Sequence, residues 1–448
     1  MADASLGDLN PPTATTPPTA PATRSVPLPD APNTGTRRLG VIDTLRGFAL
    51  LGILVPNIWF FAWPSPLSFD PARVTEVYEL TGEPDAPVAA FETAGAITEI
   101  AFIGKFMFLF AMLFGAGVVL FSRRYDRPGG RLRDGAGRWY TRCGWLFFFG
   151  AIHGFGMWFG DILLHYATAG MGVVWWCRKL KPWKVFTLAG VCYAIGTLGW
   201  LALTGMMWLG LNYSDTPPDQ IIPQVGPELE VYTDSSVSAM ILQRLTSYGF
   251  YLFIGPFTFL WQITGLMLLG VGLCRTGFLT AERSTRTYVA AICIGLPVGF
   301  AMTIGARYAI GLIDSPITGF IWMSTAQLLG APISLGYASV LILLVKTGKL
   351  TTVTNALANV GRMAFTNYIS HTLICTTVFY GHAGGLYAEV PFPMLWLVVV
   401  AVWMFNLAFS ALWLKHFRFG PLEWFWRSLT YLEFQPMRRQ PAASRLAA

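Results

Sequence analysis

The sequence predicts an all-α, polytopic integral membrane protein, a bundle of about ten transmembrane helices with both termini in the cytoplasm. Three observations predict it. Of the 448 residues, 54% are hydrophobic and only 12% are charged, whereas soluble domains carry about 25% charged residues. Apolar runs long enough to cross a hydrocarbon core of about 30 Å as helices recur along the chain. The charged residues lie between these runs, and their sign alternates from one connection to the next.

The apolar runs define the expected helices in chain order. The third and fourth are separated only by a tight turn at Gly160-Asp161. The runs cover residues 40–62, 96–121, 138–158, 161–177, 184–209, 247–273, 288–312, 318–345, 354–381 and 392–414.

The charge of the connections tests this count. Basic connections are found at 123–142, 178–184, 275–286, 346–349 and 415–427, and acidic ones at 70–85 and 215–234. Because lysine and arginine accumulate in cytoplasmic loops, the basic connections are expected in the cytoplasm. Ten helices satisfy this rule at every loop, and a miscount by one would invert the pattern partway along the chain.

The two ends of the chain differ from the rest in composition. Residues 1–36 are rich in proline, threonine and alanine and contain no apolar run, so they are not a signal peptide. We expect a disordered cytoplasmic tail there, a transmembrane domain over 37–434, and a second disordered tail over 435–448. The net charge of +7 arises from arginines between apolar runs rather than from a basic domain, so no nucleic-acid partner is expected.

Metal and soluble-enzyme motifs are absent from the sequence. The six cysteines are scattered, mostly within apolar runs, and no CxxC pair occurs. We interpret them as small buried hydrophobic residues, with neither a disulfide framework nor a metal site. No phosphate-binding loop, HExxH or GxSxG motif is present in a suitable context.

The ninth expected helix carries a polar stripe on an otherwise apolar segment. Such a stripe must face protein or a water-filled cavity, so it either lines a substrate path or joins helices by hydrogen bonds. Both interpretations stay open. The stripe consists of Asn355, Asn359, Arg362, Thr366 and Ser370, with Asn367 and His371 beside it.

The third and fourth expected helices carry ionisable residues in the outer half of the membrane. His153 lies about 21 Å from the cytoplasmic start of its helix, at 1.5 Å per residue. It is either a general base or a hydrogen-bonded core histidine. Asp161 and His165 share a helix face at spacing i, i+4. Asp161 is a candidate N-cap that can also orient an imidazole.

Other intramembrane charges lie near the cytoplasmic side or at mid-helix. Asp43 and Arg46 are spaced i, i+3 at the start of the first helix. They form either a surface ion pair or a site where the guanidinium binds phosphate of a cytoplasmic ligand. Lys105 lies within the second helix, with Glu99 nearer its outer end, and a buried lysine needs a partner.

Several runs resemble one bacterial family. They read IDTLRGFALLGILVPN over 42–57, FGAIHG over 149–154, WFGDIL over 158–163, GRMAFTNY over 361–368 and FRFGPLEWFWR over 417–427. Together they resemble the YeiB-like bacterial inner-membrane protein family, whose C-terminal half is a domain of unknown function, number 418. The resemblance covers about residues 37–435 and implies a multi-pass protein of the bacterial inner membrane.

The family is distantly similar to transmembrane acyltransferases, which include the lysosomal heparan N-acetyltransferase. The similarity rests on the Asp-x-x-Arg-Gly motif of the first helix and on the helix count. Members pass an acyl group from cytoplasmic acyl-CoA to an acceptor across the membrane, with a membrane-embedded histidine implicated. The resemblance implies His153 as the acyl-transfer base, with Asp161 orienting it, and Asp43 and Arg46 near the donor. In the heparan enzyme that histidine follows the first helix, whereas residues 63–100 here contain none.

The expected function is therefore transfer of an acyl group from acyl-CoA, such as acetyl-CoA, to an extracytoplasmic glycan or other hydroxyl or amine. No permanently bound cofactor is expected, and the partners are the bilayer and a small-molecule or glycan acceptor, with a homodimer left open. The alternatives are a transporter or exporter of a small polar molecule, although no internal repeat is found, and a sensor without turnover. Asn367 or Arg362 would stabilise the oxyanion. The residues expected along the substrate path are Asp43, Arg46, Lys105, His165, Asn359, Arg362, Thr366, Asn367 and His371.

Overall fold

The computed structural model describes residues 37–439 except 69, 83–85, 124, 127–131, 235, 314 and 316. The tail expected at 1–36, and residues 440–448 of the tail expected at 435–448, lie outside the described residues. Within the described part every named element is helical, and the only extended pairing is an isolated bridge between Phe417 and Arg438. The all-α prediction is confirmed.

The first half of the chain forms helices that include two π-helical segments, η3 and η4, with wider turns than an α-helix. In order they are α1 (Arg37–Ala62), η1 (Ser65–Ser68), η2 (Pro71–Arg73), α2 (Val74–Thr81), α3 (Val88–Ala101), α4 (Lys105–Ser122), α5 (Leu132–Ala151), η3 (Ile152–Met157), α6 (Leu163–Ala169), η4 (Gly170–Val174), α7 (Trp175–Cys177) and α8 (Pro182–Tyr213).

The second half begins with short helices and continues with longer ones. They are α9 (Pro218–Ile221), α10 (Gly226–Thr233), α11 (Val237–Ile254), η5 (Gly255–Phe257), α12 (Phe259–Arg275), α13 (Thr285–Gly311), α14 (Thr318–Thr347), α15 (Thr351–Arg362), α16 (Ala364–Phe379), η6 (Phe392–Met394), α17 (Leu395–His416) and α18 (Pro421–Tyr431).

Six helical stretches among the described residues are long and apolar enough to cross a membrane. A seventh arises if α11 and α12, which meet at a bend of 60°, count as one span. The six are Gly40–Ala62, Val88–Ser122, Pro182–Tyr213, Thr285–Gly311, Leu328–Thr347 and Phe392–His416.

Three further spans expected from the sequence, at 138–158, 161–177 and 354–381, are interrupted helices. The first continues from α5 into the π-helix η3, and the second passes from α6 into η4. The third breaks at Met363, between α15 and α16. The interrupted spans contain the histidines and the polar stripe noted above, so the irregular backbone coincides with the candidate site.

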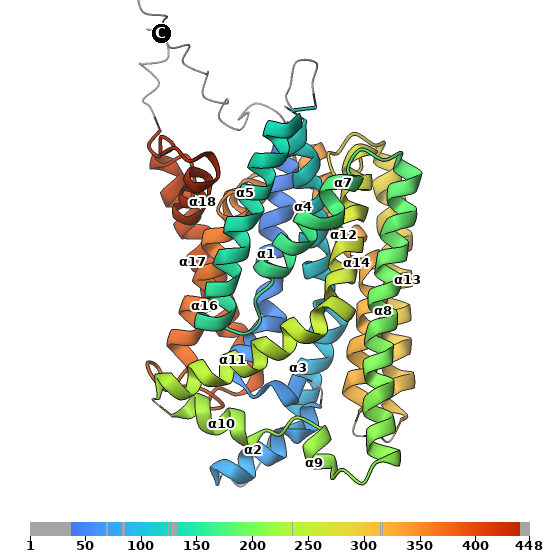
Figure 1. The fold of residues 1–448 in the computed structure, drawn as a ribbon, viewed down its shortest axis with the longest axis vertical. Coiled ribbons are helices and arrows are strands. Elements are labelled where there is room, and N and C mark those ends of the chain that lie inside the picture. The colour runs from blue at the N-terminus through green and yellow to red at the C-terminus, as the bar shows by residue number, and fades with distance from the viewer. Residues whose placement is uncertain are drawn as a thin grey trace, which may run out of the picture. The chain divides into compact units, whose positions relative to one another are not determined.

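The described helices separate charge between two ends of the bundle (Figure 1). The acidic helices α2 and α10 lie at one end together with α9, and α7 and α18, which adjoin basic connections, lie at the other. We call these the acidic end and the basic end. The loop charges that alternate along the sequence are thus gathered on opposite faces of the fold.

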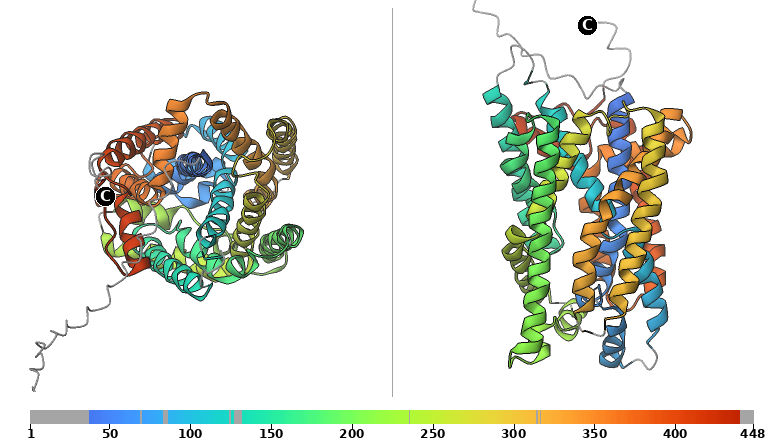
Figure 2. Two further views of the ribbon diagram at one scale, coloured as in Figure 1. Left: turned by 90° about the horizontal axis from the view of Figure 1, so that it is seen from above. Right: turned by 90° about the vertical axis from the view of Figure 1, so that its right-hand side faces the viewer.

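Helix α1 runs through the middle of the bundle, surrounded by other helices in the view along its axis (Figure 2). It packs against α4, α14, α15, α16 and α17. Its closest neighbour is α15, where two glycines face the opposite backbone. A Cβ on Gly47 would lie 1.9 Å from the carbonyl oxygen of Leu357, and one on Gly361 would lie 1.9 Å from that of Asp43. Only hydrogen side chains allow this approach.

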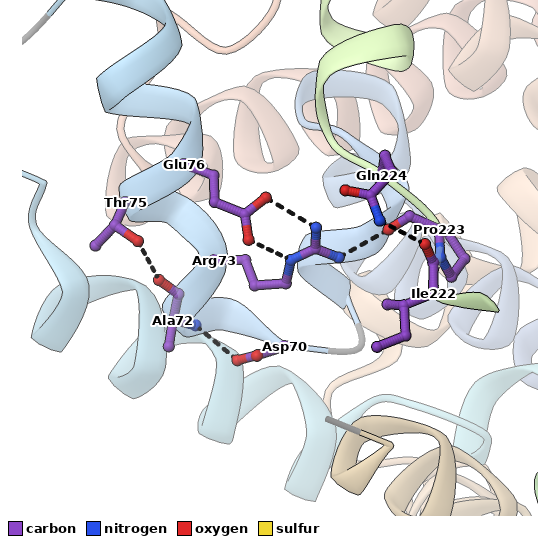
Figure 3. Close-up of polar contacts among 8 residues, drawn as sticks. All are labelled: Asp70, Ala72, Arg73, Thr75, Glu76, Ile222, Pro223 and Gln224. Carbon is purple, nitrogen blue, oxygen red and sulfur yellow. Dashed lines mark hydrogen bonds and ion pairs between the residues drawn. The ribbon is translucent and has the colours of Figure 1, made fainter. Parts of the chain in front are cut away.

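At the acidic end, Arg73 joins two segments that are far apart in sequence (Figure 3). Its Nε and Nη2 donate to the two carboxylate oxygens of Glu76 at 2.7 and 2.8 Å, and Nη1 donates to the carbonyl of Pro223 at 2.8 Å. Paired geometry of this kind satisfies both the charge and the donors of a guanidinium. The contact ties η2 and α2 to the segment that leads into α10.

At the basic end, Glu423 of α18 caps the N-terminus of α16. Its carboxylate accepts from the backbone N–H groups of Phe365 and Thr366 at 2.6 and 3.1 Å, and from the Thr366 hydroxyl at 2.6 Å. Burial raises the pKa of the Glu423 carboxyl, and the hydrogen bonds from Thr366 and Phe365 oppose that shift. A helix that starts inside a span otherwise leaves its first N–H groups without partners.

We expect Glu423→Ala to lower the free energy of unfolding by about 1–2 kcal/mol, because a cap and a charge-assisted hydrogen bond are lost together. The thermal unfolding midpoint of detergent-solubilised protein measures this effect. Glu433→Ala, at an exposed glutamate beyond the same helix, is the matched control. Equal midpoints for the two variants would contradict the capping role.

The hydrogen-bonded structure extends past the expected domain end at residue 434. Trp424 Nε1 donates to the Gln435 carbonyl at 2.6 Å, and the Arg418 N–H donates to that of Met437 at 2.9 Å. The Arg439 N–H donates to the His416 carbonyl at 3.0 Å. Composition alone does not reveal such backbone pairing, so the C-terminal segment stays attached to α17 and α18 through Arg439, the last described residue.

Candidate functional site

His153 lies on the π-helix that continues α5, in a stretch rich in glycine. A Cβ on Gly150 would lie 2.4 Å from the backbone nitrogen of Leu164, and one on Gly154 would lie 2.2 Å from the ring of Tyr248. These glycines let the end of α5 and η3 approach α6 and α11 closely. The wider π turn and the close contacts fix the direction of the histidine between these elements.

The imidazole of His153 is hydrogen-bonded on both nitrogens. Nδ1 lies 2.8 Å from Oδ1 of Asp161, and Nε2 lies 2.8 Å from the hydroxyl of Thr372 on α16. The exposed fractions of the three residues are 1%, 4% and 1%. We call His153, Asp161 and Thr372 the triad.

Two further donors hold the carboxylate of Asp161. Its Oδ2 accepts from the backbone N–H of Leu164 at 2.9 Å and from the hydroxyl of Tyr248 at 3.1 Å. The carboxylate of Asp161 therefore contacts both the first turn of α6 and the imidazole of His153. Because an ionised carboxylate only accepts hydrogen bonds, Nδ1 of His153 donates to it, and Nε2 is left to accept from Thr372.

Aromatic rings surround the imidazole. The ring of Tyr368 lies 5.1 Å from that of His153 between centroids, and the ring of Trp158 lies 6.3 Å away. The Tyr368 hydroxyl points towards the carbonyl of Gly160 at 3.4 Å. Apolar rings of this kind exclude water from the imidazole and strengthen its electrostatic interaction with Asp161.

An aspartate, a histidine and a hydroxyl in series form the arrangement that activates an oxygen nucleophile. The carboxylate holds the imidazole in one tautomer, and the free nitrogen removes the hydroxyl proton as the oxygen attacks. The triad has hydrogen-bond distances suited to proton transfer.

Sequence reasoning identified His153 and Asp161 but missed Thr372, Tyr248 and Tyr368. A signal for two of them exists in the sequence. Tyr368, Thr372 and Thr376 follow one another at spacing 4 and form a second polar row on α16. Tyr248 follows the buried Arg244 at spacing 4 on α11, and nothing in this spacing connects it with His153 or Asp161.

The stripe of the ninth expected helix mostly joins helices. Asn367 Nδ2 donates to the Val360 carbonyl at 3.2 Å and to the Ser410 hydroxyl at 2.9 Å, and Ser370 donates to Asn406 at 2.9 Å. These contacts to α17 favour the interhelical interpretation for Asn367 and Ser370.

The remaining stripe positions do not join the triad. Thr366 binds Glu423 as described above, and Arg362 donates to the Arg418 carbonyl at 3.3 Å. Asn355 is exposed and Asn359 half-buried. His371 is buried, and its Nε2 has no hydrogen-bond partner among the described residues.

His165 is buried and lies near Asp161, but it forms no hydrogen bond with the Asp161 carboxylate. Its ring packs edge-on against that of Phe259 at 5.4 Å and lies beside Gly255. Its Nδ1 has no hydrogen-bond partner in the described part of the chain. The shared helix face with Asp161 therefore does not make it a second partner of that carboxylate.

Lys105 belongs to a separate buried charge cluster. Its Nζ donates to the backbone carbonyl of Glu99 at 2.8 Å, and the Glu99 carboxylate pairs with Arg307 of α13 at 2.8 Å. The partner that the sequence left unassigned is thus the residue Glu99, held in turn by Arg307.

At the basic end, Asp43 and Arg46 form an ion pair at 3.0 Å, both partly exposed. Arg142 of α5 lies nearby, with its guanidinium stacked over the ring of Trp426 at 3.6 Å. It is within electrostatic range of Arg46 and Arg427. Three guanidinium groups gathered in this way are suited to binding phosphate groups.

Comparisons with known proteins place the sequence among relatives that are named as uncharacterised. The profile described as "Protein of unknown function (DUF418)" matches residues 273–433, which include Thr372 but neither His153 nor Asp161. "Uncharacterized protein YeiB" of Escherichia coli (strain K12) is 33% identical over 398 residues, covering 87% of this chain and 95% of that protein. "Uncharacterized protein YxaH" of Bacillus subtilis (strain 168) is 28% identical over 424 residues, covering 91% and 98%.

Proposed function

The chain belongs to the YeiB-like family of DUF418 proteins, and on that premise we propose that it is a membrane-embedded acyltransferase. It would move an acyl group from cytoplasmic acyl-CoA to a hydroxyl or amine acceptor on the other side of the membrane. The observation that carries this proposal is the buried triad, in which Nε2 of His153 lies 2.8 Å from the Thr372 hydroxyl.

In the first step Thr372 takes up the acyl group. Its oxygen attacks the thioester carbonyl carbon while Nε2 of His153 accepts the hydroxyl proton, and Asp161 stabilises the imidazolium. The carbon–sulfur bond then breaks, and the imidazolium returns the proton to the departing thiolate. The products are an acyl ester on Thr372 and free CoA thiol. The family resemblance implied only that His153 is the acyl-transfer base, and the hydroxyl already bound to Nε2 adds this covalent step.

In the second step the acceptor removes the acyl group. Its hydroxyl or amine attacks the ester carbonyl and gives its proton to Nε2 of His153, and the same proton then restores the Thr372 hydroxyl. A covalent intermediate suits a reaction whose donor and acceptor lie on opposite sides, because the two substrates need not bind together.

The basic end supports the donor side of this proposal. Arg142 precedes His153 by 11 residues, which corresponds to a rise of about 16 Å along a helix. Acyl-CoA carries its phosphates and its thioester at opposite ends of a long flexible arm. Phosphates held by Arg46, Arg142 and Arg427 would leave the thioester free to extend towards Thr372.

The proposed topology has ten membrane crossings, with the basic end and both termini in the cytoplasm of a bacterial cell and the bundle in its plasma membrane. The loop charges support this orientation, because lysine and arginine accumulate on the cytoplasmic side. The interrupted helices supply the crossings beyond the regular spans, since irregular backbone is tolerated at membrane depth when protein surrounds it.

The test is acylation of the purified protein by acetyl-CoA, followed by intact-mass and peptide mass spectrometry. We expect an acetyl adduct on Thr372, retained in Thr372→Ser and lost in Thr372→Ala. Thr376→Ala is the matched control, because that buried hydroxyl lies one turn away and donates to the backbone carbonyls of Thr372 and Leu373. Transfer at the wild-type rate by Thr372→Ala would refute the covalent step.

Transport of a small polar solute is the second candidate, and the buried cluster of Glu99, Lys105 and Arg307 favours it. Paired charges inside a membrane often mark ion or proton pathways. Solute uptake into vesicles that depends on a proton gradient and needs no acyl-CoA would support transport over transfer. Loss of that uptake in Lys105→Met, with the triad intact, would assign it to the cluster.

A further inference from the structure

Arg244 of α11 carries a buried guanidinium without a counterion. The residue is 6% exposed. Its Nη1 donates to the carbonyl of Gly156 at 2.7 Å, and the Tyr232 hydroxyl lies close enough to the side chain to interact with it. The Nε of Arg244 is buried and has no hydrogen-bond partner within the described chain. An uncompensated buried charge costs several kcal/mol, so a group of opposite charge is expected to occupy the free edge of this side chain.

Arg73, at the same end of the bundle, shows what a satisfied guanidinium looks like in this fold (Figure 3). It is paired in a fork with Glu76 and also donates to a backbone carbonyl. Arg244 has the same forked edge, formed by Nε and Nη2, with no carboxylate opposite it in the described residues. The two arginines therefore differ in that Arg73 is paired with a carboxylate and Arg244 is paired with none among the described residues.

Two tyrosines beside Arg244 place their hydroxyl groups near its guanidinium. The rings of Tyr232 and Tyr380 stack with centroids 4.5 Å apart, and the Arg244 guanidinium carbon lies 5.4 Å from the Tyr380 centroid. Both residues are almost fully buried, and the Tyr232 hydroxyl interacts with Arg244 and with Tyr380, yet neither hydroxyl makes a hydrogen bond of normal geometry in the described chain. Nearly all buried polar groups in proteins are paired, so three orphaned donors at one place point to a missing acceptor.

The nearest carboxylate does not fill this role. Glu228 lies close enough to influence Tyr232 and Tyr380, but its Oε2 accepts from the backbone N–H of Ser65 at 2.5 Å. It forms no ion pair with Arg244 in the described structure. Burial raises the pKa of the Glu228 carboxyl, and the hydrogen bonds from Ser65 act against the shift.

These donor groups lie next to the triad, on the side that faces the acidic end. Helices α10 and α11, which carry Tyr232 and Arg244, pack together at that end (Figure 1). The carbonyl that receives the Arg244 hydrogen bond belongs to Gly156, three residues after His153 on the same π-helix. Trp158, whose ring lies 6.3 Å from His153, has a buried indole N–H without a partner in the described chain.

We infer that Arg244, Tyr232 and Tyr380 form a binding site for a carboxylate or phosphate group of a ligand that enters from the acidic end. Nε and Nη2 of Arg244 bind two oxygens of the anion, and the two hydroxyls donate to the same group. The assignment of this ligand as the acyl acceptor rests on the proposed function, whereas the anion site itself does not. An acceptor anchored there would place a neighbouring hydroxyl towards Thr372.

The experiment measures ligand affinity on full-length protein in detergent, by calorimetry and by thermal shift. The probes are inorganic phosphate, glycerol 3-phosphate and D-glucuronate, with D-glucose as the uncharged control. We expect the anions to bind and raise the unfolding midpoint of wild type, and glucose to have no effect. Arg244→Gln should weaken anion binding by roughly tenfold or more, because charge-assisted hydrogen bonds are lost. Arg73→Gln is the matched control and should bind like wild type.

A second pair of variants keeps the test informative if Arg244→Gln does not fold. Tyr232→Phe and Tyr380→Phe retain the charge and the ring packing, and each should weaken anion binding several-fold. Preference for glycerol 3-phosphate would support a phosphate-bearing lipid or polymer as the ligand, and preference for glucuronate an acidic glycan.

Absence of anion binding to wild type, or equal affinities for Arg244→Gln and Arg73→Gln, would overturn the inference. Anion binding that depends on Arg244, in a protein whose Thr372 never becomes acylated, would uphold this site and reject the acyltransferase. Acylation of Thr372 in a protein that binds no anion would support the acyltransferase and reject the anion site.

Discussion

His153→Ala is expected to lower acyl transfer by roughly a hundredfold to ten-thousandfold while leaving the fold intact, because a positioned general base contributes that much. The side chain contacts Asp161 and Thr372 through its two nitrogens, so the loss removes the proton acceptor of both proposed steps. The measurement is the initial rate of CoA release at saturating acetyl-CoA, alongside the thermal unfolding midpoint.

Two companion variants separate chemistry from packing. Asp161→Asn keeps the size of the side chain but can donate to Nδ1, which favours the tautomer with a hydrogen on Nε2, so a comparable loss of rate is expected. His165→Ala, at a buried histidine outside the triad, should retain most of the activity. An unchanged rate in His153→Ala would show that the histidine is not the base.

Gly361→Ala is expected to give the largest loss of stability, about 3 kcal/mol or more, because the added methyl group meets backbone rather than a movable side chain. Its Cβ would lie 1.9 Å from the Asp43 carbonyl oxygen and 2.8 Å from the Gly47 nitrogen. Overpacking of this kind costs about 1–3 kcal/mol even where side chains can shift. The unfolding midpoint and the fraction of monodisperse protein after extraction measure it.

Gly117→Ala is the matched control, since a Cβ at that glycine of α4 would meet nothing within 4 Å. Alanine is favoured over glycine inside a helix by about 1 kcal/mol, so this variant should be as stable as wild type or more so. If the two variants unfold within about 0.5 °C of each other, a difference well under 1 kcal/mol for a chain of this length, the close contact of α1 with α15 is not what holds these helices together.

The fold class can be predicted from the sequence because the length of an apolar run and the charge of a loop are local properties of the chain. Runs such as 184–209 and 288–312 are bounded by charges, and each agrees with a helix of the structure, α8 or α13, to within a few residues. The breaks were not predictable in the same way. Met363 is an ordinary apolar residue, and what separates α15 from α16 is Glu423, which caps α16 from about 60 residues further along the chain.

The residues of the candidate site also differ in whether the sequence alone could identify them. His153 and Asp161 lie eight residues apart around a turn, so their common depth could be inferred from helix geometry. Thr372 is 219 residues from His153, and only tertiary packing brings its hydroxyl to Nε2. Asn367, which looks equally suited to a substrate path in the sequence, bonds instead to α17, because a polar side chain on a buried helix face takes the nearest partner.

Burial of the triad also has a kinetic consequence. With His153, Asp161 and Thr372 all at or below 4% exposure, neither a thioester nor an acceptor reaches the hydroxyl in this conformation. Each turnover then requires an opening motion, and such motions occur over microseconds to milliseconds and often limit kcat. A closed resting state also keeps water from hydrolysing an acyl ester. In the proposed acyl transfer, turnover should therefore respond to the thickness and fluidity of the bilayer around these helices.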